Sequence, residues 1–403
     1  APILGSTVDK SLRVLPQQDE RAAQIYSYNS MNYVMSLVNL MLVGLLLGKA
    51  ALPPGVVDFP IRVGGNRSLV ELVFDGQPVR LLPDTGGANT YVLYEDAFGE
   101  TACRTYAAGC YTCPKNSCPP SGWVNGSALF ADGTIFYYFR HAAQLDIGAI
   151  GAEVLKIEDY KLSVIKGYEP RKASPHPILG LRREPSFSRS RRSFIHQLVR
   201  GAGGAIRRLA FSITFPRSAD DVGHLTVGGD PDPAWHAPFI TLHQRDGQAW
   251  TLSIDEVGYR KGSESESIGI KRGRVLFDSG AGVIIGPVEE VTSLLNYIGK
   301  FVEFRGGDIL KLIACSDVDK LPEIWFDIMA DDAEGLTTRL FVSGRDYAVA
   351  ADKPGLCTID IAGADLVHIV HYEWILGSPL FRGYFLQFTY DVESIGFAKK
   401  RSF

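Results

Sequence analysis

The chain has 403 residues, which is enough for two domains with separate hydrophobic cores. Apolar residues make up 46% of it and charged residues 21%, a balance typical of globular proteins and not of disordered or fibrous ones. The net charge of −4 excludes a global attraction to nucleic acid or to anionic membranes, so we expect no nucleic-acid partner.

The most apolar stretch of the chain runs from Met31 to Leu47. It is shorter than the roughly 20 residues of a comfortable membrane span, and a small-x-small cleavage pattern follows it at 48–50. We interpret 31–50 as a signal peptide that lacks the usual basic start, with a propeptide or a membrane anchor as alternatives. Residues 1–54 are therefore expected to be an N-terminal extension, with membrane contact only if 31–50 is retained as an anchor.

The rest of the chain consists of short apolar runs separated by Gly, Asn, Asp and Pro. Alternating residues at 68–74, before the turn pair Asp75-Gly76, and at 223–229 predict strands. Helical patterns are few, and the clearest cover 194–199 and, after a proline, 289–298. The pattern predicts a mostly β protein.

Six cysteines fall into two groups, which are Cys103, Cys110, Cys113 and Cys118, and Cys315 and Cys357. An even number in two groups indicates disulfides formed in an oxidising compartment. For the first group the alternative is a zinc site, because Cys110-x-x-Cys113 has ligand spacing. No histidine lies near enough in sequence to complete such a site.

One chemical motif occurs twice. The run from Leu81 through Asp84-Thr85-Gly86 is matched by the run from Val275 through Asp278-Ser279-Gly280, and each is followed by an apolar-apolar-Gly triplet, at 178–180 and at 375–377. A single Asp-[Thr/Ser]-Gly is a weak signal, but two with the same surroundings at domain-sized spacing predict two similar lobes that meet at a shared site. We place the lobes at 55–233 and 234–403.

The motif has a direct chemical use. Gly permits a tight turn after an apolar strand, and the small hydroxyl of Thr85 or Ser279 can bond across to the other lobe's loop. Two such loops bring Asp84 and Asp278 within hydrogen-bond range, where both carboxyls cannot ionise together. One can then take a proton from water while the other gives one to a scissile carbonyl.

Over residues 55–400 the chain resembles the pepsin family of aspartic proteases. Phe130, Asp132, Gly133 and Thr134 resemble the flap that closes over substrate, and Tyr91 stands where the family usually has a Trp behind the flap. Cys315 and Cys357 fit the family's disulfide in the C-terminal lobe. The segment from Cys103 to Cys118 is richer in cysteine than a minimal pepsin loop; we favour Cys103–Cys110 with Cys113–Cys118, although four cysteines allow three connectivities.

The resemblance implies a bilobal, mostly β fold with the active-site cleft between two similar lobes. It implies an endopeptidase that cuts extended polypeptides, is inhibited by pepstatin-type compounds, uses no cofactor or metal and acts as a monomer. Secretion or an endomembrane or vacuolar lumen fits the cysteines and the two glycosylation triplets that begin at Asn66 and Asn125.

Four residues depart from the family pattern. Phe130 lacks the usual flap hydroxyl, Gly87 and Ala281 stand where hydroxyl residues commonly support the two aspartates, and Pro83 precedes Asp84. Fewer hydroxyl donors should raise the pKa values of the pair, so we expect a less acidic working pH. Since both carboxylates are retained, we predict an active enzyme; the alternative is a silent protein that binds a peptide or protein in the cleft.

Overall fold

The computed structural model describes residues 53–401, except residue 66, 115–117, 119–125, 151–152, 170–175, 184–192, 246, 248, 270–272, 308, 333–334 and 366–371. The expected N-terminal extension up to residue 52 and both glycosylation asparagines, Asn66 and Asn125, lie outside the described residues. In the part of the chain that is described, no helix is long and apolar enough to cross a membrane.

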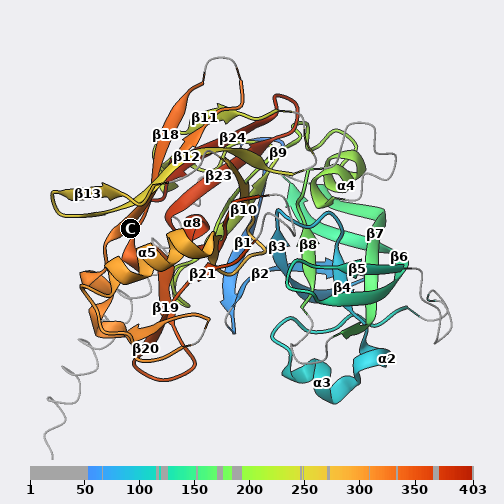
Figure 1. The fold of residues 1–403 in the computed structure, drawn as a ribbon. Coiled ribbons are helices and arrows are strands. Elements are labelled where there is room, and N and C mark those ends of the chain that lie inside the picture. Colours follow the sequence, from blue (N-terminus) through green and yellow to red (C-terminus); the bar gives the residue numbers. More distant parts are fainter. Residues whose placement is uncertain are drawn as a thin grey trace, which may run out of the picture. The chain divides into compact units, whose positions relative to one another are not determined.

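Strands dominate the described residues, as the sequence pattern predicts (Figure 1). The strands of the first half are β1 (Val57–Gly64), β2 (Arg67–Phe74), β3 (Gln77–Asp84), β4 (Tyr91–Leu93), β5 (Gly126–Leu129), β6 (Ile135–Ile150), β7 (Glu153–Glu169), β8 (Ile178–Gly180), β9 (Ala210–Thr214) and β10 (Gly223–Val227). Those of the second half are β11 (Ile240–His243), β12 (Thr251–Lys261), β13 (Glu264–Ser267), β14 (Gly273–Phe277), β15 (Ile284–Gly286), β16 (Leu312–Ala314), β17 (Glu323–Met329), β18 (Thr337–Val342), β19 (Ala348–Ala350), β20 (Leu356–Ile359), β21 (Ile361–Gly363), β22 (Trp374–Leu376), β23 (Tyr384–Thr389) and β24 (Ser394–Lys399).

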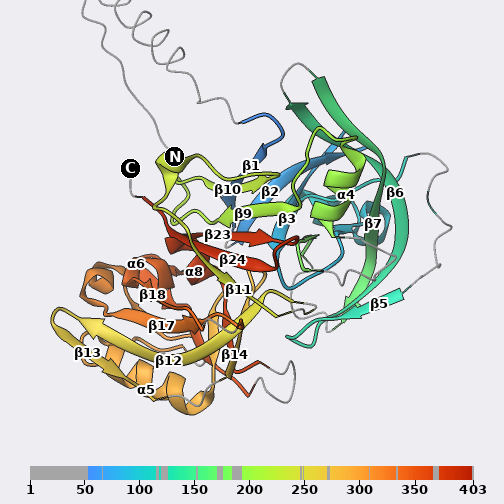
Figure 2. The same ribbon diagram turned by 90° about the horizontal axis from the view of Figure 1, so that it is seen from above.

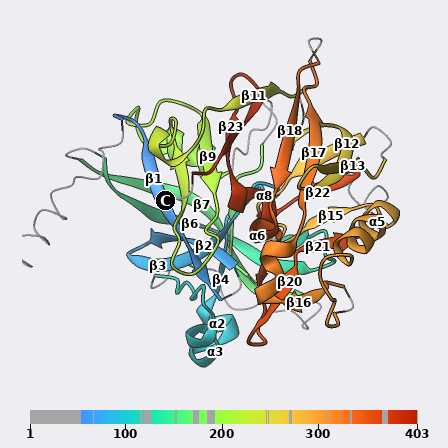
Figure 3. The same ribbon diagram turned by 90° about the vertical axis from the view of Figure 1, so that its left-hand side faces the viewer.

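The helices are short. They are α2 (Glu95–Phe98), α3 (Glu100–Thr105), α4 (Phe194–Gly201), α5 (Val288–Ile298), α6 (Gly344–Tyr347) and α8 (Ser378–Gly383), with 3-10 turns at Pro233–Trp235 and Cys315–Lys320. The two helices expected from the sequence are confirmed as α4 and α5. In α5, Val291, Leu294 and Ile298 are buried on one face, and the helix packs against β21 on the side of the C-terminal lobe (Figure 3).

A 13-stranded sheet carries the first motif, in the order β11-β24-β23-β9-β10-β1-β2-β3-β8-β4-β7-β6-β5. The predicted strand at 68–74 is β2, and its turn pair Asp75-Gly76 adopts positive φ at both residues. Strand β23, late in the sequence, pairs with β9 of the first half, and β24 pairs with the other edge of β23 (Figure 2). The sheet therefore runs across the lobe boundary expected near residue 233.

The second motif belongs to an eight-stranded sheet ordered β18-β17-β12-β14-β22-β15-β21, with β13 paired to β12. A small three-stranded sheet, β16-β20-β19, lies apart from it. Buried side chains of the two halves form one connected cluster, in which the rings of Phe211 and Trp250 each lie 4.9 Å from that of Phe388. The two lobes thus share a core instead of having separate ones.

The duplicated triplets have a structural explanation. In the first half β3 pairs in parallel with β8, which contains 178–180, and in the second β14 pairs in parallel with β22, which precedes Gly377. The chain beyond each aspartate passes close under its triplet, so that a Cβ on Gly180 would lie 2.5 Å from the carbonyl carbon of Ala88. A Cβ on Gly377 would lie 2.4 Å from the oxygen of Ala281. Only glycine fits at these two crossings.

Candidate active site

Asp84 and Asp278 come together where the two sheets end. Asp84 is the last residue of β3, Asp278 follows β14, and the side chain of Asp84 is only 7% exposed. A Cβ on Gly86 would lie 2.8 Å from the carboxyl of Asp278, and one on Gly280 would lie 2.5 Å from that of Asp84. The loop of each lobe therefore covers the carboxylate of the other.

Thr85 and Ser279 tie the two loops together through four buried hydrogen bonds. The hydroxyl of Thr85 donates to the oxygen of Phe277 (2.7 Å), and that of Ser279 donates to the oxygen of Pro83 (2.8 Å). Each hydroxyl oxygen also accepts the backbone N–H of the other residue, at 3.0 and 2.9 Å. The cross-lobe bonding expected of small hydroxyls at these positions is present, and it holds the two aspartates at a constant separation.

Backbone amides support both carboxylates. Gly86 and Gly87 donate to Oδ1 of Asp84 at 2.8 and 2.9 Å, and Gly280 donates to Oδ1 of Asp278 at 2.9 Å. The backbone carbonyl oxygen of Asp84 in turn accepts a hydrogen bond from the N–H of Leu181, the residue that follows the first triplet. Glycine at position 87 thus supplies a backbone donor where the family commonly adds a hydroxyl.

Burial raises the pKa of both aspartates. For Asp84, burial comes first and the negative charge of Asp278 second, and together they hold its pKa well above the usual range. A hydrogen bond joins the two carboxyls and raises the pKa of Asp84 while lowering that of Asp278. The two carboxyls therefore titrate as a pair that shares one proton.

The expected flap is a hairpin between β5 and β6. Its turn is closed by bonds from Phe130 N to Thr134 O (2.8 Å) and from Gly133 N to Phe130 O (2.9 Å), and Asp132 Oδ1 accepts the N–H of Thr134. The ring of Phe130 lies 4.6 Å from that of Phe136 and 6.0 Å from that of Tyr91. These are aromatic contacts, made without a hydroxyl on the flap residue.

Tyr91 belongs to an apolar cluster beneath the flap. Its other buried members are Leu93, Phe136, Tyr138, Ile165 and Ile178, and Phe130 packs against them. The hydroxyl of Tyr91 accepts a hydrogen bond from Nδ2 of Asn89 (3.2 Å), in the loop that follows the first motif. Ile178 of this cluster pairs with Leu82, two residues before Asp84, so the cluster adjoins the strand that ends in the first motif.

Three disulfides are present in the described residues, Cys103–Cys110, Cys113–Cys118 and Cys315–Cys357. The pairing is the one favoured from the sequence. The first joins Cys103 of α3 to Cys110 beyond the helix, the second joins two residues further along the chain, and the third joins the beginning of the 3-10 turn at 315–320 to β20.

Two contacts between distant parts of the chain were missed from the sequence, one beside the site and one away from it. Nε1 of Trp250 donates to the oxygen of Leu181 (3.0 Å), which links the second half to the residue just after the first triplet. His141, on β6, lies next to Cys118 although 23 residues separate them. Neither residue belongs to a local motif, and only the pairing of distant strands brings them there.

The sequence model of the eukaryotic aspartyl protease family matches residues 70–400. Pepsin A of Bos taurus is 26% identical over 202 residues, which cover 48% of this chain and 48% of that protein. Renin of Canis lupus familiaris is 26% identical over 200 residues, with 49% and 47% covered, and cathepsin D of Homo sapiens is 24% identical over 192, with 47% and 43% covered.

The chain thus spans about half the length of the curated relatives it matches. The match to the family model is longer and includes both Asp-[Thr/Ser]-Gly turns, the flap and both parallel strand pairs. The chain belongs to the eukaryotic aspartyl protease family.

Proposed function

We propose that the chain is an active endopeptidase that hydrolyses peptide bonds in extended polypeptides with a water molecule activated between Asp84 and Asp278. The observation that carries this proposal is the buried, hydrogen-bonded carboxyl pair held by the reciprocal bonds of Thr85 and Ser279. Two rigidly placed carboxyls that share one proton are the minimum needed for concerted acid–base hydrolysis.

The mechanism needs one ionised and one protonated carboxyl, and a pair that shares one proton supplies both. The ionised member takes a proton from the water, whose oxygen then attacks the carbonyl carbon of the peptide bond. The protonated member gives its proton to the carbonyl oxygen, so that no free oxyanion forms. Collapse of the resulting gem-diol breaks the C–N bond, with the amine leaving group taking a proton from the pair.

The substrate and the cellular location belong to the same proposal. The aromatic cluster around Tyr91 and Phe130 supports an apolar side chain beside the cut bond, and we propose that the hairpin at 130–134 covers the extended chain. Three disulfides favour an oxidising compartment, either outside the cell or in an endomembrane lumen. We propose pepstatin-type compounds as inhibitors.

The test is cleavage of a quenched peptide library between about pH 3 and 7, a range around and above the ordinary Asp pKa of about 3.9. Turnover should be inhibited by pepstatin and should fall by about 10³-fold or more in Asp84→Asn and in Asp278→Asn, since each removes a proton-transfer group. Asp159→Asn is the matched control, because Asp159 is exposed and its ion pair is with the exposed Lys161.

No turnover at any pH from a folded, disulfide-intact sample would exclude the endopeptidase. Phe130, Gly87 and Ala281 would then favour the second candidate, a catalytically silent protein that binds a peptide in the cleft. Pepstatin binding should also be measured by calorimetry, because binding requires an assembled cleft but no catalysis. An active endopeptidase and a silent binding protein should both bind pepstatin, and a misfolded sample should not.

A further inference from the structure

Trp250 is hydrogen-bonded to the backbone on both sides of the carboxyl pair. It lies just before β12, its side chain is fully buried, and its backbone oxygen accepts the N–H of Phe277 (3.0 Å), the residue before Asp278. Its indole Nε1 donates to the oxygen of Leu181 (3.0 Å), in the other half of the chain. One residue therefore contacts the strand end that carries Asp278 and the segment beside the loop of Asp84.

The bond to Leu181 acts on the peptide unit between residues 181 and 182. The carbonyl of this unit accepts the indole N–H, and its amide, Arg182 N, donates to the oxygen of Gly87 (2.9 Å). The N–H of Gly87 in turn donates to Oδ1 of Asp84 (2.9 Å). Because a peptide unit is planar, the indole N–H helps to fix the direction in which the Arg182 amide points, and the two bonds of the unit polarise each other. The indole is thus connected to Asp84 through the 181–182 peptide and Gly87.

Tyr390 adds a second donor to the same carbonyl. Its hydroxyl donates to the oxygen of Leu181 at 3.4 Å, and its ring lies 4.9 Å from that of Trp250 in an edge-to-face arrangement. A carbonyl oxygen has two lone pairs and can accept both bonds. Both donors come from the second half of the chain, so the position of the 181–182 peptide depends on the second half as well as on its own sheet.

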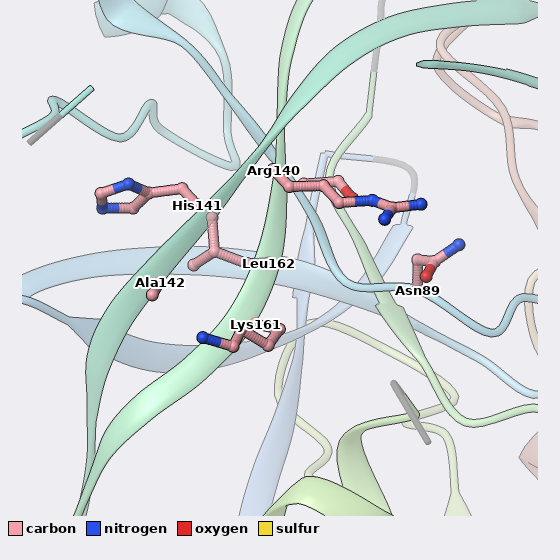
Figure 4. A pocket seen from close by; sticks show the side chains of 7 residues that line it. Asn89, Arg140, His141, Ala142, Lys161 and Leu162 are labelled. Atoms are coloured by element: carbon pink, nitrogen blue, oxygen red, sulfur yellow. The ribbon is translucent and has the colours of Figure 1, made fainter. Parts of the chain in front are cut away.

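Side-chain packing around the loop after Asp84 is incomplete at Asn89. A pocket lies there, and in Figure 4 the side chains of Asn89 and Arg140 border it from different elements. The pocket is also lined by His141 and Ala142 of β6 and by Lys161, Leu162 and Ser163 of β7. Because the loop borders an open pocket here, its position depends more on backbone hydrogen bonds such as the one that Gly87 accepts from Arg182.

We propose that Trp250 is a positioning residue for the peptide hydrolysis proposed above, and that it sets where Asp84 lies relative to Asp278. Its indole N–H holds the peptide that supports the loop of Asp84, and its backbone oxygen holds the residue before Asp278. This link crosses the lobe boundary in addition to the direct hydrogen bonds between the two loops. A group outside the chemistry can matter in this way, because a misplacement of about 1 Å can slow an enzyme by about 100-fold.

The test is the steady-state kinetics of Trp250→Phe, which keeps an aromatic ring next to Phe388 but removes the N–H donor. The kcat for a quenched peptide should fall by about 10- to 100-fold while KM changes by less than about 2-fold, because the carboxyls move and the walls of the cleft do not. The pH–rate profile should also shift, since the pKa values of a coupled pair depend on the separation of its members. An unchanged kcat in the folded variant overturns the proposal.

Trp325→Phe is the matched control. Nε1 of Trp325 also donates to a backbone oxygen, that of Tyr259 (3.2 Å), and the side chain is also buried. Its strand, β17, pairs with β12 and β18, whereas β14 leads to the second motif. The control should lose stability as Trp250→Phe does but keep its kcat. An equal fall of kcat in both variants would assign the effect to a general loss of packing and overturn the proposal.

Tyr390→Phe removes the second donor to the same oxygen and is informative if Trp250→Phe does not fold. It should lower kcat several-fold with KM unchanged. Tyr347→Phe is its control, because the buried hydroxyl of Tyr347 donates to the backbone oxygen of Pro322 (2.7 Å). If Trp250→Phe does not fold, an unchanged kcat in Tyr390→Phe, or an equal fall in Tyr347→Phe, overturns the proposal.

Titration of the carboxyl pair tests the positioning role even if the chain hydrolyses no peptide, an outcome that would exclude the endopeptidase. The full chain is labelled with ¹³C at the aspartate carboxyls and titrated by NMR. The signals of the pair are those that disappear in Asp84→Asn and Asp278→Asn. Trp250→Phe should shift their titration and Trp325→Phe should not; identical titration in Trp250→Phe and the unmodified chain overturns the proposal.

Discussion

A Cβ atom on Gly87 would lie 2.5 Å from Oδ2 of Asp84. Any side chain at position 87 must therefore displace the carboxylate, which is held from its other oxygen by the amides of Gly86 and Gly87. Because position 87 has no side chain, the Asp84 carboxylate can lie close enough to accept the hydrogen bonds of these two amides.

Gly87→Ser should move the pH–rate profile of peptide cleavage toward lower pH. A serine hydroxyl that donates to the Asp84 carboxylate favours its ionised form and so lowers the pKa of the pair. Gly87→Ala is the matched control, since it introduces the same Cβ without a donor. It should reduce kcat without moving the profile downward; an equal shift in both variants would show that crowding, and not the hydroxyl, sets the pKa.

If the proposed activity holds, the unmodified chain should cleave peptides at a less acidic pH than an unperturbed aspartate would allow. Burial raises the pKa of both carboxyls, so the form with one shared proton persists to higher pH than the ordinary value of about 3.9. The measurement is kcat/KM against pH with one quenched peptide. A maximum below about pH 3 would contradict the expectation.

Removing the carboxyl of Asp84 should change how stability depends on pH. A carboxyl whose pKa is raised by folding contributes most to the free energy of unfolding below its unfolded pKa of about 3.9, and this contribution is lost as the pH rises. Asp84→Asn has no such group and does not lose this contribution. The Tm of the variant minus the Tm of the unmodified chain should therefore increase as the pH rises from about 4 to 7. A pH-independent difference in Tm would contradict this.

Thr85→Val should destabilise the protein and nearly abolish activity. The variant keeps the shape of the side chain but removes the bond to Phe277 O and leaves the amide of Ser279 without an acceptor. Leaving such a buried group unsatisfied costs about 1–3 kcal/mol, measurable by urea unfolding. Thr85→Ser, which keeps the hydroxyl, should lose less than about 1 kcal/mol and retain most of the activity.

Phe130→Tyr should increase kcat/KM several-fold with little change in Tm. Phe130 is only partly buried, so a hydroxyl can be added at the flap without a cavity or an overpacked core. Phe130→Leu, the control, loses the ring contacts with Phe136 and Tyr91 and should lower kcat/KM. Unchanged kinetics in Phe130→Tyr would show that the proposed activity needs no hydroxyl at position 130.

The candidate site could be predicted from the sequence because its chemistry is local. Asp84-Thr85-Gly86 and Asp278-Ser279-Gly280 each contain the carboxylate, the hydroxyl and the turn glycine within three residues. Strand β2 and helix α5 were equally accessible, since their apolar residues repeat with the period of the element.

What could not be predicted depends on pairing between distant strands. The contact between His141 and Cys118 exists because β6 is 16 residues long and passes by the cysteine loop, which no short-range pattern encodes. The bond from Trp250 to Leu181 joins residues on opposite sides of the expected boundary. The shared core around Phe388 also depends on distant strands, because β23 pairs with β9. The length of the chain had suggested two separate cores instead.

The position of β23 and β24 within the 13-stranded sheet has a consequence for synthesis on the ribosome. These strands lie between β9 and β11, so the sheet that carries Asp84 has a gap until residue 399 has been translated and has left the exit tunnel. Strand β9 meanwhile exposes an unpaired edge that can pair with other chains. The nascent protein is therefore expected to depend on chaperone protection late in translation and to acquire its paired carboxyls only after most of the polypeptide has emerged.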